Sequence, residues 1–238
     1  MQSVVRAIYP PQCVACETQT EAEHGLCGPC WAETEFIGGL VCDTCGAPQL
    51  GADHGERVQC DDCMLVARPW DQGRAVLVYK GIGRRLVLGL KHGDRLDLTW
   101  PAATWMAARV GSLLRDDSVI VPVPLHWSRL LKRRYNQAAI LTQDLGKQVK
   151  RPVLVDGLVR VARTKPLDGH SRDARFAAIT GTIRPHPKRG ANLDGKSVLL
   201  VDDVMTSGAT LAASTEAARE AGATNVSIVT LARVVKDA

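Results

Sequence analysis

The sequence predicts an α/β protein, with a mainly parallel sheet covered by helices on both faces and a small metal-stabilised module before it. Between residues 74 and 235, short apolar runs alternate with helical patterns, which is typical of βαβ units. All eight cysteines lie in the first 63 residues. So short a segment has few apolar residues to form a core, and bound metal would stabilise it. We therefore expect a module over 1–67 and a larger domain over 68–238.

Composition and charge narrow the class of protein. The chain has 238 residues and is 45% hydrophobic, which suits one ordinary domain and a small one. Eight thiolates on two Zn²⁺ ions would lower the formal net charge from +5 to +1, so overall charge does not indicate nucleic-acid binding. No apolar run approaches the ~20 residues of a membrane span, and no signal-peptide pattern is evident. We expect a soluble, cytoplasmic protein without a transmembrane segment.

The cysteines fall in four C-x-x-C pairs, which indicates two tetrahedral Cys₄ zinc sites. Without an export signal, disulfides are disfavoured, and a redox C-x-x-C usually occurs once. A closed Cys₄ site has no open coordination position, so we expect a structural role. Sequential pairing closes the shorter loops and is favoured, although crossed pairing, first with third and second with fourth, stays open. In the sequential pairing one site contains Cys13, Cys16, Cys27 and Cys30, and the other Cys42, Cys45, Cys60 and Cys63.

The pattern of apolar residues predicts the elements of the larger domain. Strands are expected over 74–79, 118–123, 153–155, 158–161, 197–202 and 226–235, and helices over 82–91, 98–115, 135–149, 172–179 and 208–221. A polar surface loop is predicted for 184–196. Basic residues of the first helix, among them Arg84, Arg85 and Lys91, are expected on its solvated face.

Residues 198–210, Val-Leu-Leu-Val-Asp-Asp-Val-Met-Thr-Ser-Gly-Ala-Thr, carry the clearest functional pattern. Asp202 and Asp203 are expected where a buried strand ends, followed by a turn of small residues and a helix N-terminus. The unpaired amides of such a turn suit a phosphate, and Gly208 lets the backbone approach it closely. Carboxylates beside a phosphate pocket suit the hydroxyls of a sugar on the same ligand, so the pattern indicates a ribose 5-phosphate unit. The alternative is an ordinary βα unit whose acidic pair is solvated. A Walker A loop and a Rossmann turn are excluded for want of their glycine patterns.

At every position this stretch resembles the signature of type I phosphoribosyltransferases for 5-phosphoribosyl 1-pyrophosphate (PRPP). The resemblance implies that fold, and it implies that Asp202 and Asp203 hold the ribose hydroxyls. It assigns the 5′-phosphate to Thr206, Ser207, Gly208, Ala209 and Thr210. In a catalytic member, Mg²⁺ would bridge pyrophosphate and ribose hydroxyls, and pyrophosphate would leave C1 through an oxocarbenium-like state.

Two basic segments match the parts of that superfamily that hold pyrophosphate. The segment after strand 118–123 carries Arg129, Lys132, Arg133 and Arg134, and its interleaved Trp127 and Tyr135 make a nucleic-acid backbone the competing ligand. The polar segment that begins at Arg163 matches in position the loop that closes over PRPP. The resemblance gives Arg163 and Lys165 a catalytic role there, with Arg172 and Arg175 also able to reach the pyrophosphate. For each of these residues the alternative is a disordered solvent loop.

The whole chain resembles the ComF family, in which a double zinc ribbon precedes a phosphoribosyltransferase domain. The matching features are the C-x-x-C pairs, Tyr79-x-Gly81, Leu90-Lys91-His92-Gly93, Val121-Pro122-Val123-Pro124-Leu125, Arg134-Tyr135-Asn136-Gln137, Arg163-Thr164 and 198–210. The resemblance implies competence and natural transformation, with PRPP as ligand and single-stranded DNA or a competence helicase as partner. A non-enzymatic DNA-handling factor with PRPP as regulator and a purine-salvage phosphoribosyltransferase are the alternatives. An acceptor pocket is expected within 74–98.

Overall fold

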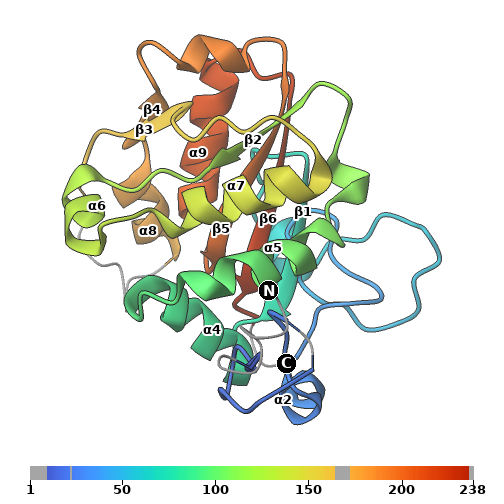
Figure 1. Ribbon diagram of the computed structural model, residues 1–238. Coiled ribbons are helices and arrows are strands. Elements are labelled where there is room, and N and C mark those ends of the chain that lie inside the picture. The colour runs from blue at the N-terminus through green and yellow to red at the C-terminus, as the bar shows by residue number, and fades with distance from the viewer. Residues whose placement is uncertain (1–9, 22, 164–171, 236–238) are drawn as a thin grey trace.

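The computed structural model describes residues 10–21, 23–163 and 172–235, and its centre is a four-stranded parallel sheet. The strand order is β1-β6-β5-β2 (Figure 1). All four strands are largely buried, as expected for parallel strands covered on both faces. This confirms the predicted α/β class. The strands are β1 (Gln72–Val78), β2 (Ser118–Pro122), β5 (Ser197–Met205) and β6 (Asn225–Arg233).

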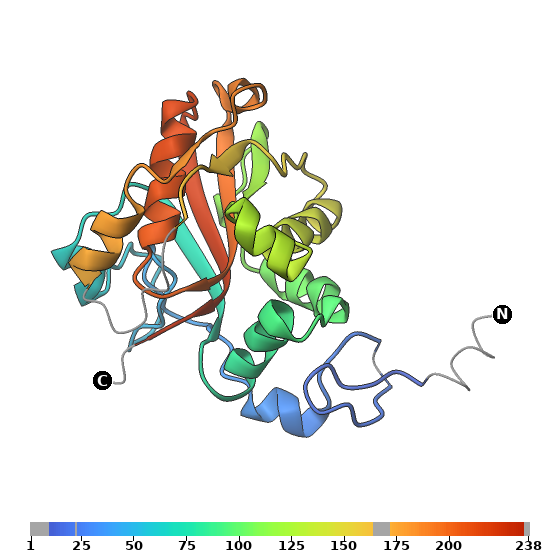
Figure 2. The ribbon, with the colours of Figure 1, turned by 90° about the vertical axis from the view of Figure 1, so that its left-hand side faces the viewer.

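Helices cover both faces of the sheet, as Figure 2 shows from the side. The helices α4 (Gly81–His92), α5 (Thr99–Ala107) and α7 (Gln137–Val149) lie on one face, and α8 (Arg172–Ile179) and α9 (Ala209–Glu220) on the other. Side chains alternate along β5. Leu199 therefore joins the core beneath α4, α5 and α7, whereas Leu200 packs on the α9 side.

The N-terminal segment packs into both of these cores. It contains two short helices, α2 (Gly28–Glu33) and α3 (Asp61–Leu65). Cys13 and Cys30 belong to the core of the α4, α5 and α7 face, whereas Cys42, Cys45 and Cys63 belong to the core of the α9 face. The second group of cysteines thus shares a core with β5 and α9, which lie on either side of the turn in the 198–210 stretch.

A small antiparallel sheet lies beside the main one. It pairs β3 (Leu158–Arg160) with β4 (Ile183–Pro185). The prediction of a loop over 184–196 was therefore wrong at its start, and a 3-10 turn follows at Gly190–Leu193. The expected strand over 153–155 is reduced to an isolated bridge between Val153 and Ile120.

Two helix predictions need correction. The segment after β2, for which no helix was predicted, contains the short helix α6 (Trp127–Arg133), and the His126 ring accepts a hydrogen bond from the Ser128 amide at its start. Arg134 then adopts φ 66° and ends the helix, and Asn136 caps α7 through the Ala138 amide. The helix expected over 98–115 ends at Ala107, and only 3-10 turns flank it, at Leu96–Leu98 and Gly111–Leu113.

The strand β5 is longer than predicted, and this places the acidic pair inside it. Its pairing with β6 continues to Met205, opposite Arg233. Its pairing with β2 stops at Val201, opposite Pro122. Asp202 is therefore the first residue of β5 whose β2 side is unpaired, and the sheet opens there. Over the described ranges, no helix is both long and apolar enough to cross a membrane.

Candidate functional site

A cavity of about 1360 Å³ lies where the sheet opens, at the carboxyl ends of β2 and β5. Asp202 and Asp203 line it, together with the residues of the turn after β5. Cavities at the carboxyl ends of parallel strands are the usual ligand sites of open α/β sheets. The cavity is also lined by the arginines Arg129, Arg133, Arg134, Arg160, Arg163 and Arg175.

The turn between β5 and α9 has the form of an anion-binding turn. Gly208 adopts φ 83° and is followed directly by the first residue of α9. A Cβ atom at Gly208 would lie 3.0 Å from the ring of Trp70, so no larger residue fits without moving its neighbours. The first amides of α9 have no acceptor within their own helix. Among the described side chains, Ser207 caps these amides weakly: the Ala209 amide donates a long hydrogen bond of 3.4 Å to Ser207 Oγ.

The two neighbouring carboxylates have different surroundings because consecutive side chains leave a strand on opposite faces. Asp203 is 4% exposed, and it pairs with Lys91 of α4 at 3.1 Å and accepts a hydrogen bond from Gln137 of α7 at 3.2 Å. Asp202 is half-buried at the cavity wall, and its Oδ1 accepts a hydrogen bond from the Asp203 amide at 2.9 Å. Asp202 is therefore the carboxylate better placed to meet a ligand.

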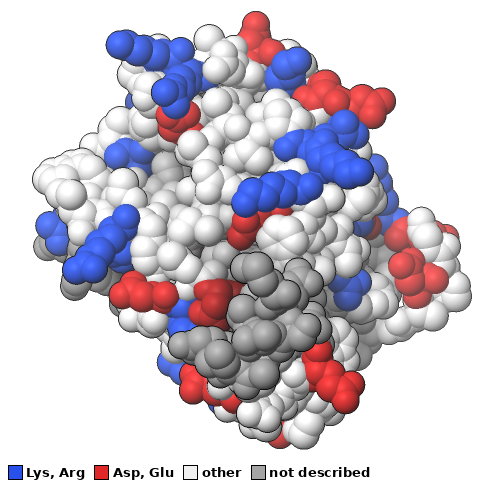
Figure 3. All heavy atoms as spheres, in the orientation of Figure 1, with Lys and Arg blue, Asp and Glu red and all other residues white. Residues whose placement is uncertain are grey.

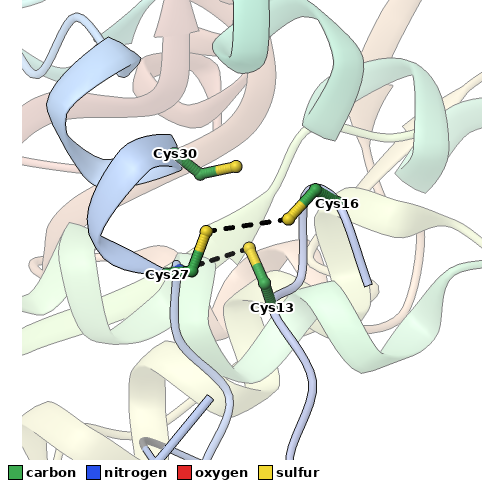
Figure 4. Close-up of side chains that lie close together, drawn as sticks. All are labelled: Cys13, Cys16, Cys27 and Cys30. Atoms are coloured by element: carbon green, nitrogen blue, oxygen red, sulfur yellow. Dashed lines mark hydrogen bonds between the residues drawn. The ribbon is translucent and has the colours of Figure 1, made fainter. Parts of the chain in front are cut away.

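The cysteines form two compact groups. Figure 4 shows Cys13 and Cys16 on one loop facing Cys27 and Cys30 at the start of α2. In each group the ligand atoms lie within 4.8 Å of one another, and the sulfurs of Cys16 and Cys27 are 3.6 Å apart. Zinc–sulfur bonds of about 2.3 Å in a tetrahedron place sulfurs about 3.8 Å apart, so both groups fit zinc. The predicted sequential grouping is confirmed, and the second group contains Cys42, Cys45, Cys60 and Cys63.

Family models and curated proteins match both parts of the chain. Residues 4–64 match a double zinc ribbon domain and residues 147–237 a phosphoribosyl transferase domain. Competence protein F of Haemophilus influenzae is 27% identical over 93% of this chain and 96% of its own. Competence protein ComFC of Bacillus subtilis is 23% identical over 89% and 85%. DNA utilization protein YhgH of Escherichia coli K12 is 25% identical over 95% and 98%. The chain thus resembles ComF-type proteins over nearly its whole length.

Electrostatics give the two carboxyl groups of the acidic pair different properties. Burial, and then the negative charge of Asp203, raise the pKa of Asp202 to about 7, although the positive charge of Lys91 opposes the shift. Near neutral pH the Asp202 carboxyl is therefore protonated in part of the molecules. Such a group can accept a hydrogen bond from a ligand hydroxyl when ionised and donate one when protonated.

The arginines that line the cavity repel one another. Burial lowers the pKa of Arg129, and the charges of Arg133 and Arg163 add to the shift. Burial and the charge of Arg129 likewise lower the pKa of Arg160, against the attraction of Asp202. A protein that collects like charges in this way loses stability unless an anion joins them. The cavity is therefore suited to a ligand with several negative charges.

The structure brings most of the predicted site residues to this cavity. Asp202, Asp203, Arg129, Arg133, Arg163 and the residues 206–210 all line it. Lys165 lies outside the described residues. The expectation of a solvated Lys91 was wrong, because the helix α4 directs its C-terminal turn toward Asp203. Arg160 was missed, although a charged residue within the apolar pattern of 158–161 is a signal for it.

Proposed function

We propose that this protein binds PRPP in the cavity at the end of β5. The observation that carries the proposal is that one cavity is lined by an anion-binding turn, a half-buried carboxylate and a group of arginines. PRPP has a phosphate at one end, two ribose hydroxyls in the middle and a pyrophosphate at the other. Each part of this ligand thus has a chemically matching part of the cavity.

The amides that follow Ser207 would bind the 5′-phosphate, helped by the partial positive charge at the N-terminus of α9. Asp202 would bind the ribose hydroxyls, with Asp203 behind it. Arg129, Arg160 and Arg163 would bind the pyrophosphate, since charge-assisted bonds from guanidinium groups suit an anion of this kind.

Magnesium would accompany the ligand. Among the described residues, the only groups of three or more potential metal ligands are the two sets of cysteines. The cavity therefore offers Asp202 and Asp203 but no metal site of its own, and PRPP oxygens would provide most of the ligands of Mg²⁺. The ion would neutralise charge on the pyrophosphate.

Calorimetric titration of PRPP with Mg²⁺ tests the proposal. The wild type should bind one PRPP per chain, and the Asp202→Ala/Asp203→Ala variant should bind at least tenfold more weakly. Asp116→Ala is the matched control, because Asp116 is an exposed carboxylate outside the cavity. Equal binding by wild type and the double variant would reject the site. Release of pyrophosphate when nucleobases are added would identify the purine-salvage alternative.

Single-stranded DNA is a second candidate ligand, favoured by one specific feature. The helix α6 exposes Trp127 at 65% and Leu131 at 73%, whereas its Arg129 and Arg133 line the cavity. An exposed aromatic ring beside arginines suits stacked bases and their phosphates. On the face drawn in Figure 3, Lys and Arg side chains form separate groups interspersed with Asp and Glu, so this face offers no continuous basic surface. Relatives named for competence and DNA utilization support the same ligand.

Fluorescence anisotropy with a labelled oligonucleotide tests this second candidate. We expect binding that weakens steeply with salt and that loses at least fivefold in affinity in Trp127→Ala. Trp100→Ala is the matched control, because Trp100 is an exposed tryptophan on α5, on a different helix from the cavity arginines. Equal losses in the two variants, or affinity independent of salt, would reject α6 as a DNA-binding surface.

A further inference from the structure

Arg233, at the end of β6, is a buried cation beneath the anion-binding turn. It is 4% exposed, and its Nη1 atom donates hydrogen bonds to the carbonyl oxygens of Thr206 at 2.7 Å, Val234 at 2.6 Å and Met205 at 3.3 Å. In the part of the chain that the structure describes, no carboxylate pairs with Arg233, and its buried Nε atom has no hydrogen-bond partner. A buried charge surrounded only by neutral groups is costly, so a counter-charge is required.

The second group of cysteines can provide this counter-charge. Arg233 lies close enough to Cys45 for a charge on one side chain to act on the other. Four thiolates on one Zn²⁺ carry a net charge of −2. The metal-loaded centre would therefore place negative charge next to Arg233.

The same group of cysteines also supports the turn mechanically. Thr44 lies between Cys42 and Cys45, and its carbonyl oxygen accepts a 2.5 Å hydrogen bond from the indole nitrogen of Trp70. The Trp70 ring lies directly behind Gly208 of the turn. The position of this ring therefore depends on the loop that carries two of the four predicted zinc ligands.

A second arginine, Arg68, also supports the turn after β5 on the side away from the cavity. Arg68 donates a 2.7 Å hydrogen bond to the Ser207 carbonyl oxygen, and its guanidinium lies 5.6 Å from the centroid of the Trp70 ring. Together with Arg233, it satisfies three consecutive carbonyl oxygens of the turn, those of residues 205–207. Carbonyl groups held on the outer side leave the amides that follow free to point into the cavity.

We propose that the second four-cysteine centre, acting through Arg233 and Trp70, holds the turn after β5 in its phosphate-binding shape, so that phosphate binding depends on metal at this centre. The proposal rests on the proposed function, in which this turn binds the 5′-phosphate of PRPP. Cys13 and Cys30 of the first centre belong to the core on the opposite face of the sheet, and among the described residues no hydrogen bond joins this centre to the turn. Metal at the first centre should therefore affect phosphate binding far less.

Substitution of Arg233 tests the electrostatic part. Arg233→Met removes the charge and keeps much of the side-chain volume. We expect PRPP affinity, measured by calorimetry, to fall at least tenfold while metal analysis still finds two zinc ions per chain. Arg151→Met is the matched control, because Arg151 also donates to a backbone carbonyl oxygen, that of Asp116, but lies outside the cavity. Unchanged PRPP affinity in Arg233→Met would overturn the proposal.

Zinc release tests the link without reference to any activity. Because coupling between two binding sites is reciprocal at equilibrium, saturating PRPP should raise the affinity of the second centre for zinc, so that a competing chromogenic chelator removes less zinc at equilibrium. Cys60→Ser and Cys16→Ser each remove one ligand, from the second and the first centre respectively. We expect Cys60→Ser to lose most PRPP affinity and Cys16→Ser to change it less than threefold.

The outcomes separate this proposal from the proposed function. If the zinc-loaded wild type does not bind PRPP, the proposed function itself fails. If the wild type binds PRPP but zinc release is the same with and without it, only the link between centre and turn is rejected. If Cys60→Ser does not fold, the folded Arg233→Met variant decides, since it tests the same link with both zinc ions in place.

Discussion

Lys91 Nζ lies 3.1 Å from Asp203 Oδ1, and this ion pair gives two adjacent carboxylates different tasks. Asp203 joins α4 and α7 to the end of β5, because Gln137 also donates to it. Asp202 faces the cavity without such a partner and is close enough to Arg160 to act on its charge. The first carboxylate of the pair is thus available to a ligand, and the second holds the wall of the cavity in place.

Replacing Asp203 should therefore mainly affect the stability of the folded protein. Asp203→Asn leaves the Lys91 side chain, which is only 20% exposed, without its counter-charge. Loss of one partner of a buried charged pair should lower the free energy of unfolding by about 1–3 kcal/mol. Urea denaturation measures this value. In the Lys91→Met background the same substitution should cost clearly less, and strictly additive effects would show that the pair is not coupled.

The raised pKa of Asp202 predicts how stability depends on pH. An aspartate of an unfolded chain titrates at about 3.9, whereas the pKa of Asp202 in the folded protein is about 7. Between these values the folded state holds a proton that the unfolded state has lost. The free energy of unfolding contributed by this group therefore falls as pH rises through the window.

Asp202→Asn removes this titration. The variant should lose less stability than the wild type between about pH 4 and pH 7, and it should be the more stable of the two above this window. Thermal unfolding at closely spaced pH values measures the difference. Parallel pH profiles for the two proteins would show that the folded-state pKa of Asp202 is not raised.

Gly208→Ala should damage the turn more than backbone strain alone explains. Gly208 has φ 83°, and an added Cβ atom would lie 3.0 Å from Trp70 and 3.2 Å from Arg68. Gly195→Ala is the matched control, because Gly195 also has a positive φ, 67°, but has open space at its Cβ position.

Both glycine substitutions should cost about 1–2 kcal/mol of strain in the left-handed region. Only Gly208→Ala should also weaken PRPP binding, by at least tenfold, because the turn must move. Calorimetry together with urea denaturation separates the two effects. PRPP affinity that is lowered equally in both variants would mean that general destabilisation is the cause.

Arg160 should contribute to binding rather than to folding. It is buried, and burial and the charge of Arg129 lower its pKa, whereas the negative charge of Asp202 opposes the shift. Arg160→Met removes both the repulsion by Arg129 and the attraction by Asp202, so stability should change little. PRPP affinity should fall about tenfold or more, as loss of a charge-assisted bond implies. Arg184→Met is the control, because Arg184 lies on the paired strand β4 with its side chain exposed. Loss of stability without loss of affinity would contradict this role.

The sequence was informative where the signal is local. The turn after β5 could be predicted because its residue types each follow from local backbone geometry and anion chemistry. The sequential cysteine groups followed from loop length. The extent of β5 could not be predicted, because it is set by a neighbouring strand, β6, that continues to Arg233 after β2 has ended.

The remaining site residues depend on long-range packing. Three separate elements carry Lys91, Arg160 and Arg233. Only folding of the sheet brings these residues near the end of β5. Each stands in or beside an apolar pattern, so its charge was a signal that a partner was needed, but nothing in the sequence identified the partner. The capping residue His126 was a local signal for α6 that the basic composition of the segment obscured, whereas the helix α7 was predicted.

The structure of the protein crystallised with PRPP and Mg²⁺ tests the central claim most directly. We predict electron density for the 5′-phosphate within hydrogen-bond distance of the amides of the turn after Ser207, for the ribose hydroxyls at Asp202, and for the pyrophosphate among Arg129, Arg160 and Arg163. A 5′-phosphate bound away from this turn, or a cavity without PRPP at concentrations that saturate the protein in solution, would contradict the account.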